Sequence, residues 1–250
     1  MRHATALVTG ATSGLGLATA KALVARGYTL IGVDRDAPAP SEGAAEDGII
    51  QVAADVTDED QMAAAVGVAT DRGPLRLTVC CAGISASGRI LGRSGPHPLE
   101  RFRAAVEVNL VGTFNTMRLA AEAMAQNPVE DDERGAIVLT SSVTAYDGQV
   151  GQIAYAASKA GVAGMTLPAA RDLGRTRIRV VAIAPGTFET PMLAGLTPQA
   201  REALAAQIPH PSRPGVPEEF AALVCHIAEN RMLNGEVIRL DGALRMPYLP

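Results

Sequence analysis

The stretch Thr9-Gly10-Ala11-Thr12-Ser13-Gly14-Leu15-Gly16 decides how this chain of 250 residues folds. A short apolar, β-prone run leads into it from Ala4, and an alanine-rich run of helical propensity, Leu17–Arg26, follows it. Gly27 then occupies the C′ position at which helices commonly end. Glycines between a strand and a helix let backbone N–H groups approach an anion at the helix N-terminus, where the dipole favours negative charge. The stretch therefore predicts a phosphate-binding turn.

A second strand-like run follows the first helix and ends on an acid. This run is Tyr28–Val33, and Asp34 comes eighteen residues after Gly16. Strand, glycine-rich turn, helix, strand and acid within about 30 residues are typical of dinucleotide binding, although here the glycines are spaced T-G-x-x-x-G-x-G. A carboxylate at this position accepts hydrogen bonds from ribose hydroxyls and repels a 2′-phosphate, which favours NAD over NADP. Arg35 keeps NADP open, since a guanidinium could pair with that phosphate.

Strand-like and helical runs alternate along the rest of the chain. Further strands are expected at Ile49–Ala54, Leu77–Cys80, Ala136–Thr140, Ile178–Ala184 and Glu236–Leu240. Helices are expected to begin near Thr57 and near Gly151 and to span Leu99–Gln126 and Glu218–Glu229. Alternation of this kind predicts parallel βαβ crossovers. The expected fold class is α/β, a single Rossmann-type domain over residues 1–250 with a doubly wound parallel seven-stranded sheet and helices on both faces.

Four segments between these elements are expected to be loops. Ala37–Asp47 and the charge run Glu130–Arg134 read as exposed loops, and Ile84–Pro98 as a flexible connection beside the active site. Thr187–Pro217 holds a short helical piece at Thr197–Gln207. Because a segment of this length between elements is usually a binding lid, we expect it to cover the substrate.

The composition limits the partners of this protein. Hydrophobic residues make up 48% of the chain and charged residues 19%, enough apolar matter for a sizeable core. The net charge is −4 without a Lys/Arg cluster, and aromatic residues are only 3% with no Trp, so neither nucleic acid nor a membrane is expected as a partner. No signal peptide or apolar run of about 18 residues is visible, and the expected location is cytoplasmic.

Three cysteines, Cys80, Cys81 and Cys225, are too few and wrongly spaced for a disulfide framework or a zinc site. We therefore expect free thiols in a reducing compartment and no metal.

Tyr155 and Lys159 stand four residues apart, so in a helix both side chains leave the same face. The ammonium favours the phenolate and is expected to lower the tyrosine pKa from its ordinary value of about 10. Ser142, at the end of the fifth strand, could bind the oxygen on which charge develops. Asn109 falls in the middle of a helix, where its propensity is poor, which raises the question of a polar role. Taken alone, the Tyr-x-x-x-Lys pattern is short enough to be an ordinary surface pair.

Jointly these motifs resemble the short-chain dehydrogenase/reductases over essentially the whole chain. The matching residues, in the order and spacing of that family, are Thr9-Gly10-x-x-x-Gly14-x-Gly16, Cys81-Ala82-Gly83, Asn109, Ser142, Tyr155-x-x-x-Lys159 and Pro185-Gly186. Within the family, three stretches resemble the type II 3-hydroxyacyl-CoA dehydrogenases: Gly148–Gln152, Gly164–Leu173 and Asn234–Ala243. Many members carry Asn-Asn where this chain has Cys80-Cys81. That position acts mostly through its backbone, so neither thiol is expected to be catalytic.

The resemblance implies a full set of site residues. It implies catalysis by Asn109, Ser142, Tyr155 and Lys159, with Lys159 also on the nicotinamide ribose and Asn109 orienting a water that relays protons. The implied cofactor site comprises Gly10, Ser13, Gly14, Leu15, Gly16, Asp34, Asp55, Val56, Cys81, Ala82, Gly83, Tyr155, Lys159, Pro185, Gly186, Phe188 and Thr190. Ser142 and Tyr155 are expected to contact substrate, together with Gln149 and Gln152 in the loop before the helix.

The implied activity is the reversible, NAD-dependent oxidation of the 3-hydroxyl of short-chain and 2-methyl-branched 3-hydroxyacyl-CoA. A hydroxysteroid dehydrogenase, an NADPH-linked 3-oxoacyl reductase and a non-catalytic NAD-binding interaction subunit remain open as alternatives. Arg89, Arg93 and Arg213 are candidates for the CoA phosphates, with solvated loop charges as the other reading. The resemblance also implies a homotetramer that packs partly through the long helices carrying Asn109 and Lys159.

Overall fold

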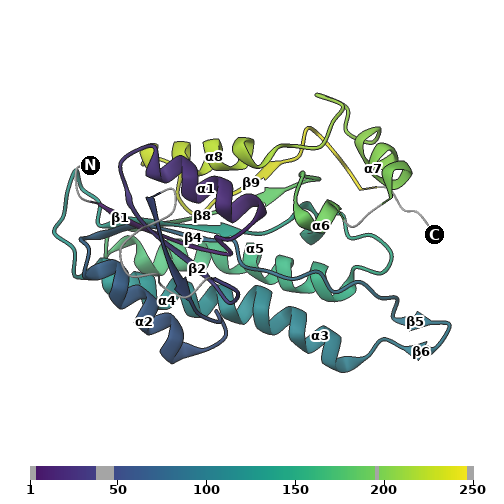
Figure 1. Cartoon of the computed structure of the whole chain (residues 1–250), viewed down its shortest axis with the longest axis horizontal. Coiled ribbons are helices and arrows are strands. Elements are labelled where there is room, and N and C mark those ends of the chain that lie inside the picture. The colour runs from purple at the N-terminus through teal and green to yellow at the C-terminus, as the bar shows by residue number, and fades with distance from the viewer. Residues whose placement is uncertain (1–3, 38–47, 195–196, 247–250) are drawn as a thin grey trace.

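The computed structural model describes residues 4–37, 48–194 and 197–246, and Figure 1 shows its layers. Its main sheet has seven parallel strands in the order β3-β2-β1-β4-β7-β8-β9. Their bounds are β1 Thr5–Thr9, β2 Thr29–Asp34, β3 Ile49–Ala53, β4 Leu75–Cys80, β7 Gly135–Thr140, β8 Ile178–Pro185 and β9 Val237–Leu240. The predicted Rossmann-type sheet is confirmed.

Helices cover both faces of this sheet (Figure 1). On one face lie α1 (Gly14–Val24) and α8 (Pro217–Glu229), which pack against each other. On the other lie α2 (Glu59–Thr70), α3 (Leu99–Val106), α4 (Gly112–Ala125) and α5 (Ile153–Gly174). None of the helices in the described part of the chain is long and apolar enough to cross a membrane.

The apolar side chains of the strands alternate between two hydrophobic cores. Leu7 and Ile31 point to the core under α2, α4 and α5, while Val8 and Leu30 point to the core under α1 and α8. All four are fully buried, as is Phe220 of α8 in the second core. Burying a side chain of this size stabilises a fold by roughly 1.5–3 kcal/mol, so both helical layers hold the strands in place.

The expected helix Leu99–Gln126 is interrupted. A π-helical turn, η2 (Glu107–Val111), separates α3 from α4, and Asn109 lies at its centre with its side chain fully buried. Asparagine is unfavourable inside an α-helix, but here it lies in a wider π-helical turn. Such turns are frequent at functional sites, so the position agrees with a polar role for Asn109.

Two of the expected loops hold structure that the sequence did not indicate. Ile84–Pro98 is not wholly irregular, since β5 (Leu91–Gly92) and β6 (Gly95–Pro96) form an antiparallel hairpin. The charge run Glu130–Arg134 is not simply solvated, because Glu133 forms an ion pair with Arg179, whose side chain is only 7% exposed. Arg179 also donates to carbonyl oxygens at the end of α8, so the pair joins that helix to β8.

The long segment after β8 contains two short helices. These are α6 (Pro191–Ala194) and α7 (Pro198–Ala205), the second within the expected piece Thr197–Gln207. Of the other expected loop, Ala37–Asp47, only Ala37 lies within the described residues.

Candidate active site

The sheet order places a crevice at the carboxyl ends of β1 and β4. From β1 the chain proceeds outward through β2 to β3, whereas β4 and the later strands extend the sheet the other way. Loops leaving neighbouring strands in opposite directions open a crevice at this switch point, where open α/β sheets bind ligands. The residues predicted for the site follow β1, β4, β7 and β8 at this edge.

Backbone groups of the glycine turn approach each other so closely that side chains are excluded. A Cβ on Gly16 would lie 2.1 Å from the carbonyl oxygen of Gly10, and one on Gly10, where φ is +68°, would lie 2.9 Å from the amide nitrogen of Ala82. Helix α1 starts at Gly14, and its N-cap, Ser13, makes no capping hydrogen bond through its side chain. With no acidic residue in its first turn, the helix N-terminus fits an anionic group.

Asp34 ends β2 beside this turn and is held by Thr12. One carboxylate oxygen accepts hydrogen bonds from the Thr12 hydroxyl at 2.5 Å and from its backbone N–H at 3.3 Å. The other oxygen accepts from the N–H of Asp36 at 3.4 Å. Thr12 was not among the predicted site residues, although its place inside the glycine turn was a usable signal.

Asp55 and Val56 follow β3 on the same side of the crevice. Hydrogen bonds from the N–H and hydroxyl of Thr57 hold the pKa of Asp55 below its ordinary value. Val56 is buried against Gly112, where a Cβ would lie 2.5 Å from a Val56 methyl group.

The loop after β4 approaches β1 through its backbone. The N–H of Cys81 donates to the Thr9 carbonyl and that of Ala82 to the Thr9 hydroxyl. Burial raises the pKa of the Cys81 thiol to about 11, so this group stays protonated and is a poor nucleophile. These contacts agree with the expectation that neither Cys80 nor Cys81 is catalytic.

Ser142, Tyr155 and Lys159 meet beyond the end of β7. Ser142 caps the short 3₁₀ helix η3 (Val143–Ala145), where its hydroxyl accepts from the N–H of Thr144 at 3.1 Å and donates to the Thr144 hydroxyl at 3.2 Å, and it lies close enough to the Tyr155 phenol to lower the pKa of that group. On α5, Lys159 lies one turn after Tyr155, with its ammonium nitrogen 5.8 Å from the centre of the phenol ring. The predicted shared face is therefore present.

Burial dominates the protonation of both groups. It raises the pKa of Tyr155, and the hydrogen bond from Ser142 lowers it only in part. The expectation of a lowered tyrosine pKa was wrong for this structure, because loss of hydration disfavours the phenolate. Burial also lowers the pKa of Lys159 to about 8, while its ammonium donates to the Thr140 carbonyl at 2.8 Å.

Asn109 fixes the neighbouring loop. Its amide nitrogen donates to the Ile84 carbonyl and to the Ser158 hydroxyl, each at 3.0 Å, and its oxygen accepts from the Ile84 N–H at 2.7 Å. At Gly83, a Cβ would lie 3.1 Å from the Asn109 side-chain oxygen and 3.5 Å from the Lys159 nitrogen. Both amide N–H donors are engaged and the backbone carbonyl accepts from the Thr113 hydroxyl, so a water at Asn109 would use the second lone pair of the side-chain oxygen.

Gln149 and Gln152 lie in the half-buried loop between η3 and α5. Gln152 donates weakly to Ser87 at 3.5 Å, while its side-chain oxygen is buried and makes no hydrogen bond within the described residues. The adjacent Gly151 carbonyl accepts from the N–H of Gly88 at 2.7 Å. Two loops distant in sequence thus form one wall of the site.

The segment after β8 returns to the glycine turn. The N–H of Gly186 donates to the Leu240 carbonyl, and Phe188 is buried on Gly215. Thr190 comes within 3.4 Å of the position of a Cβ on Gly14, so this segment and the turn are neighbours.

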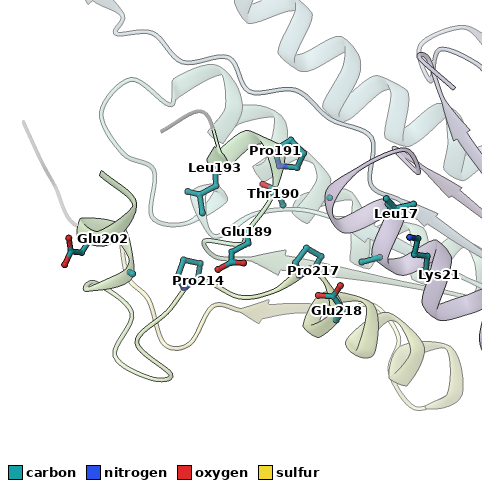
Figure 2. Close-up of a pocket in the computed structure, with 13 residues that line it drawn as sticks. Leu17, Lys21, Glu189, Thr190, Pro191, Leu193, Glu202, Pro214, Pro217 and Glu218 are labelled. Carbon is teal, nitrogen blue, oxygen red and sulfur yellow. The ribbon is translucent and has the colours of Figure 1, made fainter. Parts of the chain in front are cut away.

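A cavity of about 710 Å³ opens between this segment, α1 and the start of α8 (Figure 2). Its lining includes Gly14, Thr190 and Leu193, with the carboxylates of Glu189 and Glu218 at its wall. Tyr155 and Ser142 do not line it. The cavity therefore adjoins the glycine turn and lies apart from the Tyr155 cluster.

The chain belongs to the short-chain dehydrogenase family, whose family model matches residues 4–201. It is therefore an oxidoreductase by class. It is 50% identical to the 3-hydroxyacyl-CoA dehydrogenase type-2 of Drosophila melanogaster, over 98% of this chain and 99% of that protein. A crystal structure of 3-hydroxyacyl-CoA dehydrogenase type-2 from Mycobacterium avium superimposes with a TM-score of 0.89 at 41% identity, covering 98% of this chain and 97% of the other. The 3-oxoacyl-[acyl-carrier-protein] reductase FabG of Thermotoga maritima is 35% identical over 95% of this chain and 96% of its own.

Proposed function

We propose that this protein oxidises the 3-hydroxyl group of short-chain 3-hydroxyacyl-CoA thioesters reversibly with NAD. The observation that carries the proposal is the meeting of Ser142, Tyr155 and Lys159 beyond β7, beside a glycine turn that fits an anion. The names of the similar enzymes from fly and mycobacterium supply the substrate class.

The residues around the glycine turn fit a dinucleotide. The uncapped start of α1 suits the pyrophosphate, and the oriented carboxylate of Asp34 suits an adenosine ribose. Arg35 forms an ion pair with Asp36 at 3.6 Å, so a carboxylate already accompanies the guanidinium that NADP would need. NAD, when bound, supplies the hydride acceptor.

Tyr155 acts as the general base in this proposal. Its phenol oxygen takes the hydroxyl proton of the substrate, and Ser142 donates a hydrogen bond to the oxygen on which charge develops. Lys159 stabilises the ionised phenol by its positive charge and binds the nicotinamide ribose. Because burial raises the pKa of Tyr155, the charge of Lys159 is what makes the phenolate accessible.

Asn109 positions Ile84 and Ser158 around this centre through the three hydrogen bonds of its amide. We include it in the catalytic set as the residue that keeps the loop after β4 in place; a relay water would use the second lone pair of its side-chain oxygen, which already accepts from the Ile84 N–H.

Residues 187–217 form the substrate lid in this proposal. The place of the segment beside the glycine turn supports it, because Thr190 packs against Gly14; the cavity of about 710 Å³ lies between the segment, α1 and α8, apart from Tyr155. Arg213 is engaged by Glu219 at 2.8 Å, which leaves Arg89 and Arg93 as the better candidates for CoA phosphates. We also propose a homotetramer packed through α4 and α5, where Phe114 (51% exposed) and Leu167 (44% exposed) face outward.

The test is a turnover panel with Tyr155→Phe. Wild-type enzyme is expected to oxidise 3-hydroxybutyryl-CoA with NAD in preference to a hydroxysteroid, and to use NADP poorly. The variant should lose at least about 10²-fold in kcat, since proton transfer contributes 10²–10⁴-fold, and should keep its NAD affinity. Tyr28→Phe, at the other end of the sheet, is the matched control. Full turnover by Tyr155→Phe would show that Tyr155 is not the general base. A preference of the wild type for NADPH and an acyl-carrier thioester would show that the protein is a 3-oxoacyl reductase instead.

A further inference from the structure

Arg239 of β9 connects segments that are far apart in the sequence. It donates to a carboxylate oxygen of Asp147 at 2.5 Å, to a carboxylate oxygen of Asp241 at 2.7 Å and to the Leu244 carbonyl at 2.9 Å. Its guanidinium also lies 5.7 Å from the centre of the Tyr146 ring. A planar guanidinium that pairs with two partly buried carboxylates makes strong and directional hydrogen bonds. Arg239 therefore fixes the positions of Asp147 and Asp241 relative to each other.

One of these acceptors belongs to the loop that separates Ser142 from Tyr155. Asp147 comes two residues after η3, and its N–H donates to the Val143 carbonyl. The rest of this loop carries Gln149 and Gln152 to the start of α5 and has few apolar anchors, since Tyr146 is 53% exposed. Asp147 is the charged residue of this loop, and its carboxylate is only 18% exposed.

The other acceptor belongs to a turn packed against the lid segment. Asp241, whose side chain is 7% exposed, comes so close to Gly186 that a Cβ there would lie 2.8 Å from the Asp241 Cβ. The next residue, Gly242, lies under the far part of the lid segment, where a Cβ would meet the His210 carbonyl oxygen at 2.6 Å. Arg239 therefore bridges the substrate-side loop and both ends of the lid segment.

We propose that Arg239 and Asp147 are positioning residues that set the substrate-side loop relative to the lid, and so determine the affinity for the hydroxyl substrate. The proposal rests on the function proposed above. Neither residue contacts Ser142, Tyr155 or Lys159 through a hydrogen bond or ion pair described here, so their action runs through the loop. Asp147→Asn should raise KM for the alcohol and leave NAD binding unchanged, because Asp147 holds the loop before α5, whereas replacing Arg239 also releases Asp241 at Gly186 and should change both.

The experiment compares Asp147→Asn, Arg239→Lys and Arg239→Met with the wild type. Asp147→Asn preserves side-chain volume and leaves Arg239 paired with Asp241, so the fold is kept. For Asp147→Asn we expect KM to rise about tenfold, the loss expected of a hydrogen bond between charged groups, with kcat within threefold and the Kd for NAD within twofold. Arg239→Lys should recover part of the loss seen in Arg239→Met. Glu130→Gln, which breaks the Arg76 pair at the opposite edge of the sheet, is the matched control for ion-pair removal.

Hydrogen exchange supplies a readout that does not depend on turnover. Amides of residues 143–152 should exchange faster in Asp147→Asn, and those of 186–193 should follow only when Arg239 is replaced. An unchanged KM together with unchanged exchange overturns the proposal, as does a lowered melting temperature with normal KM, which is the signature of a purely structural pair. If the wild type oxidises no hydroxyacyl-CoA, the proposed function is wrong. The hydrogen-exchange pattern then still tests whether Arg239 and Asp147 position the loop.

Discussion

Lys159 offers a quantitative test of how the site is built, because burying its amine makes the free energy of unfolding depend on pH in a calculable way. Its pKa is about 8 in the folded protein, against an ordinary value of 10.5 in the unfolded chain. Between these values the unfolded state binds a proton that the folded state lacks, so the free energy of unfolding rises with pH. At about 1.4 kcal/mol per unit, the rise attributable to Lys159 is about 3 kcal/mol between pH 8 and pH 10.5, and it is absent below pH 7.

The measurement compares unfolding of two proteins across this range. Tyr155→Phe serves as the background, so that the neighbouring phenol does not titrate, and Lys159→Met is added to it. Urea unfolding followed by circular dichroism at pH 7, 8, 9 and 10 gives the two stability curves. We expect the free energy of unfolding of the parent to rise relative to that of Lys159→Met by about 1.4 kcal/mol for each pH unit above 8, because only the parent carries the buried amine.

The chain contains two lysines, Lys21 and Lys159, which makes the control simple. Lys21 is exposed on α1, so Lys21→Met removes the other lysine without touching the Tyr155 cluster. Isotope labelling of lysine side chains gives two signals, and the one that persists in Lys21→Met should titrate near pH 8. Parallel stability curves for the parent and Lys159→Met, or a midpoint above 10, would refute the reasoning that desolvation governs this site.

Three further substitutions test the supporting structure. Gly16→Ala places a Cβ 2.1 Å from the Gly10 carbonyl oxygen, so we expect the Kd for NAD to rise more than about tenfold in a calorimetric titration. Gly67→Ala is the control glycine substitution: its Cβ meets open space, so it should stabilise the protein by about 0.5–1 kcal/mol. Unaltered NAD affinity in Gly16→Ala would argue against the tight turn. Glu133→Gln leaves the charge of Arg179 buried without its anion and should destabilise the fold by about 3–5 kcal/mol in urea unfolding, with normal kcat for the folded enzyme; a loss under 1 kcal/mol would mean that the carbonyl acceptors suffice.

The strands and the glycine turn were predictable because their signals are local. Alternating Leu7 and Val8 report opposite faces of a sheet, and a glycine whose Cβ would strike a carbonyl can be replaced by no other residue. Asp34 likewise follows its strand directly, so its place at the crevice needs only the strand assignment.

Features that depend on residues distant in sequence were missed. Arg179 and Glu133 are 46 positions apart, and Asp147 and Arg239 are 92 apart, so neither pair leaves a pattern in a local window. The protonation of Tyr155 was misjudged for the same reason. Its neighbour Lys159 is visible from the spacing, but the burial that outweighs the charge is a property of the assembled core.

The π-helical turn at Glu107–Val111 makes the number of residues between α3 and α4 critical for their orientation. Such a turn accommodates one more residue than an α-helical turn, and each residue rotates a helix by about 100°. Deleting Val108 would let α3 and α4 merge into one regular helix, with Leu99–Val106 turned by that angle. Ala105, now fully buried, would leave its place against the fold, and α3 would lose its present packing against α5 beside Asn109. The active site thus depends on a helix that is one residue out of phase.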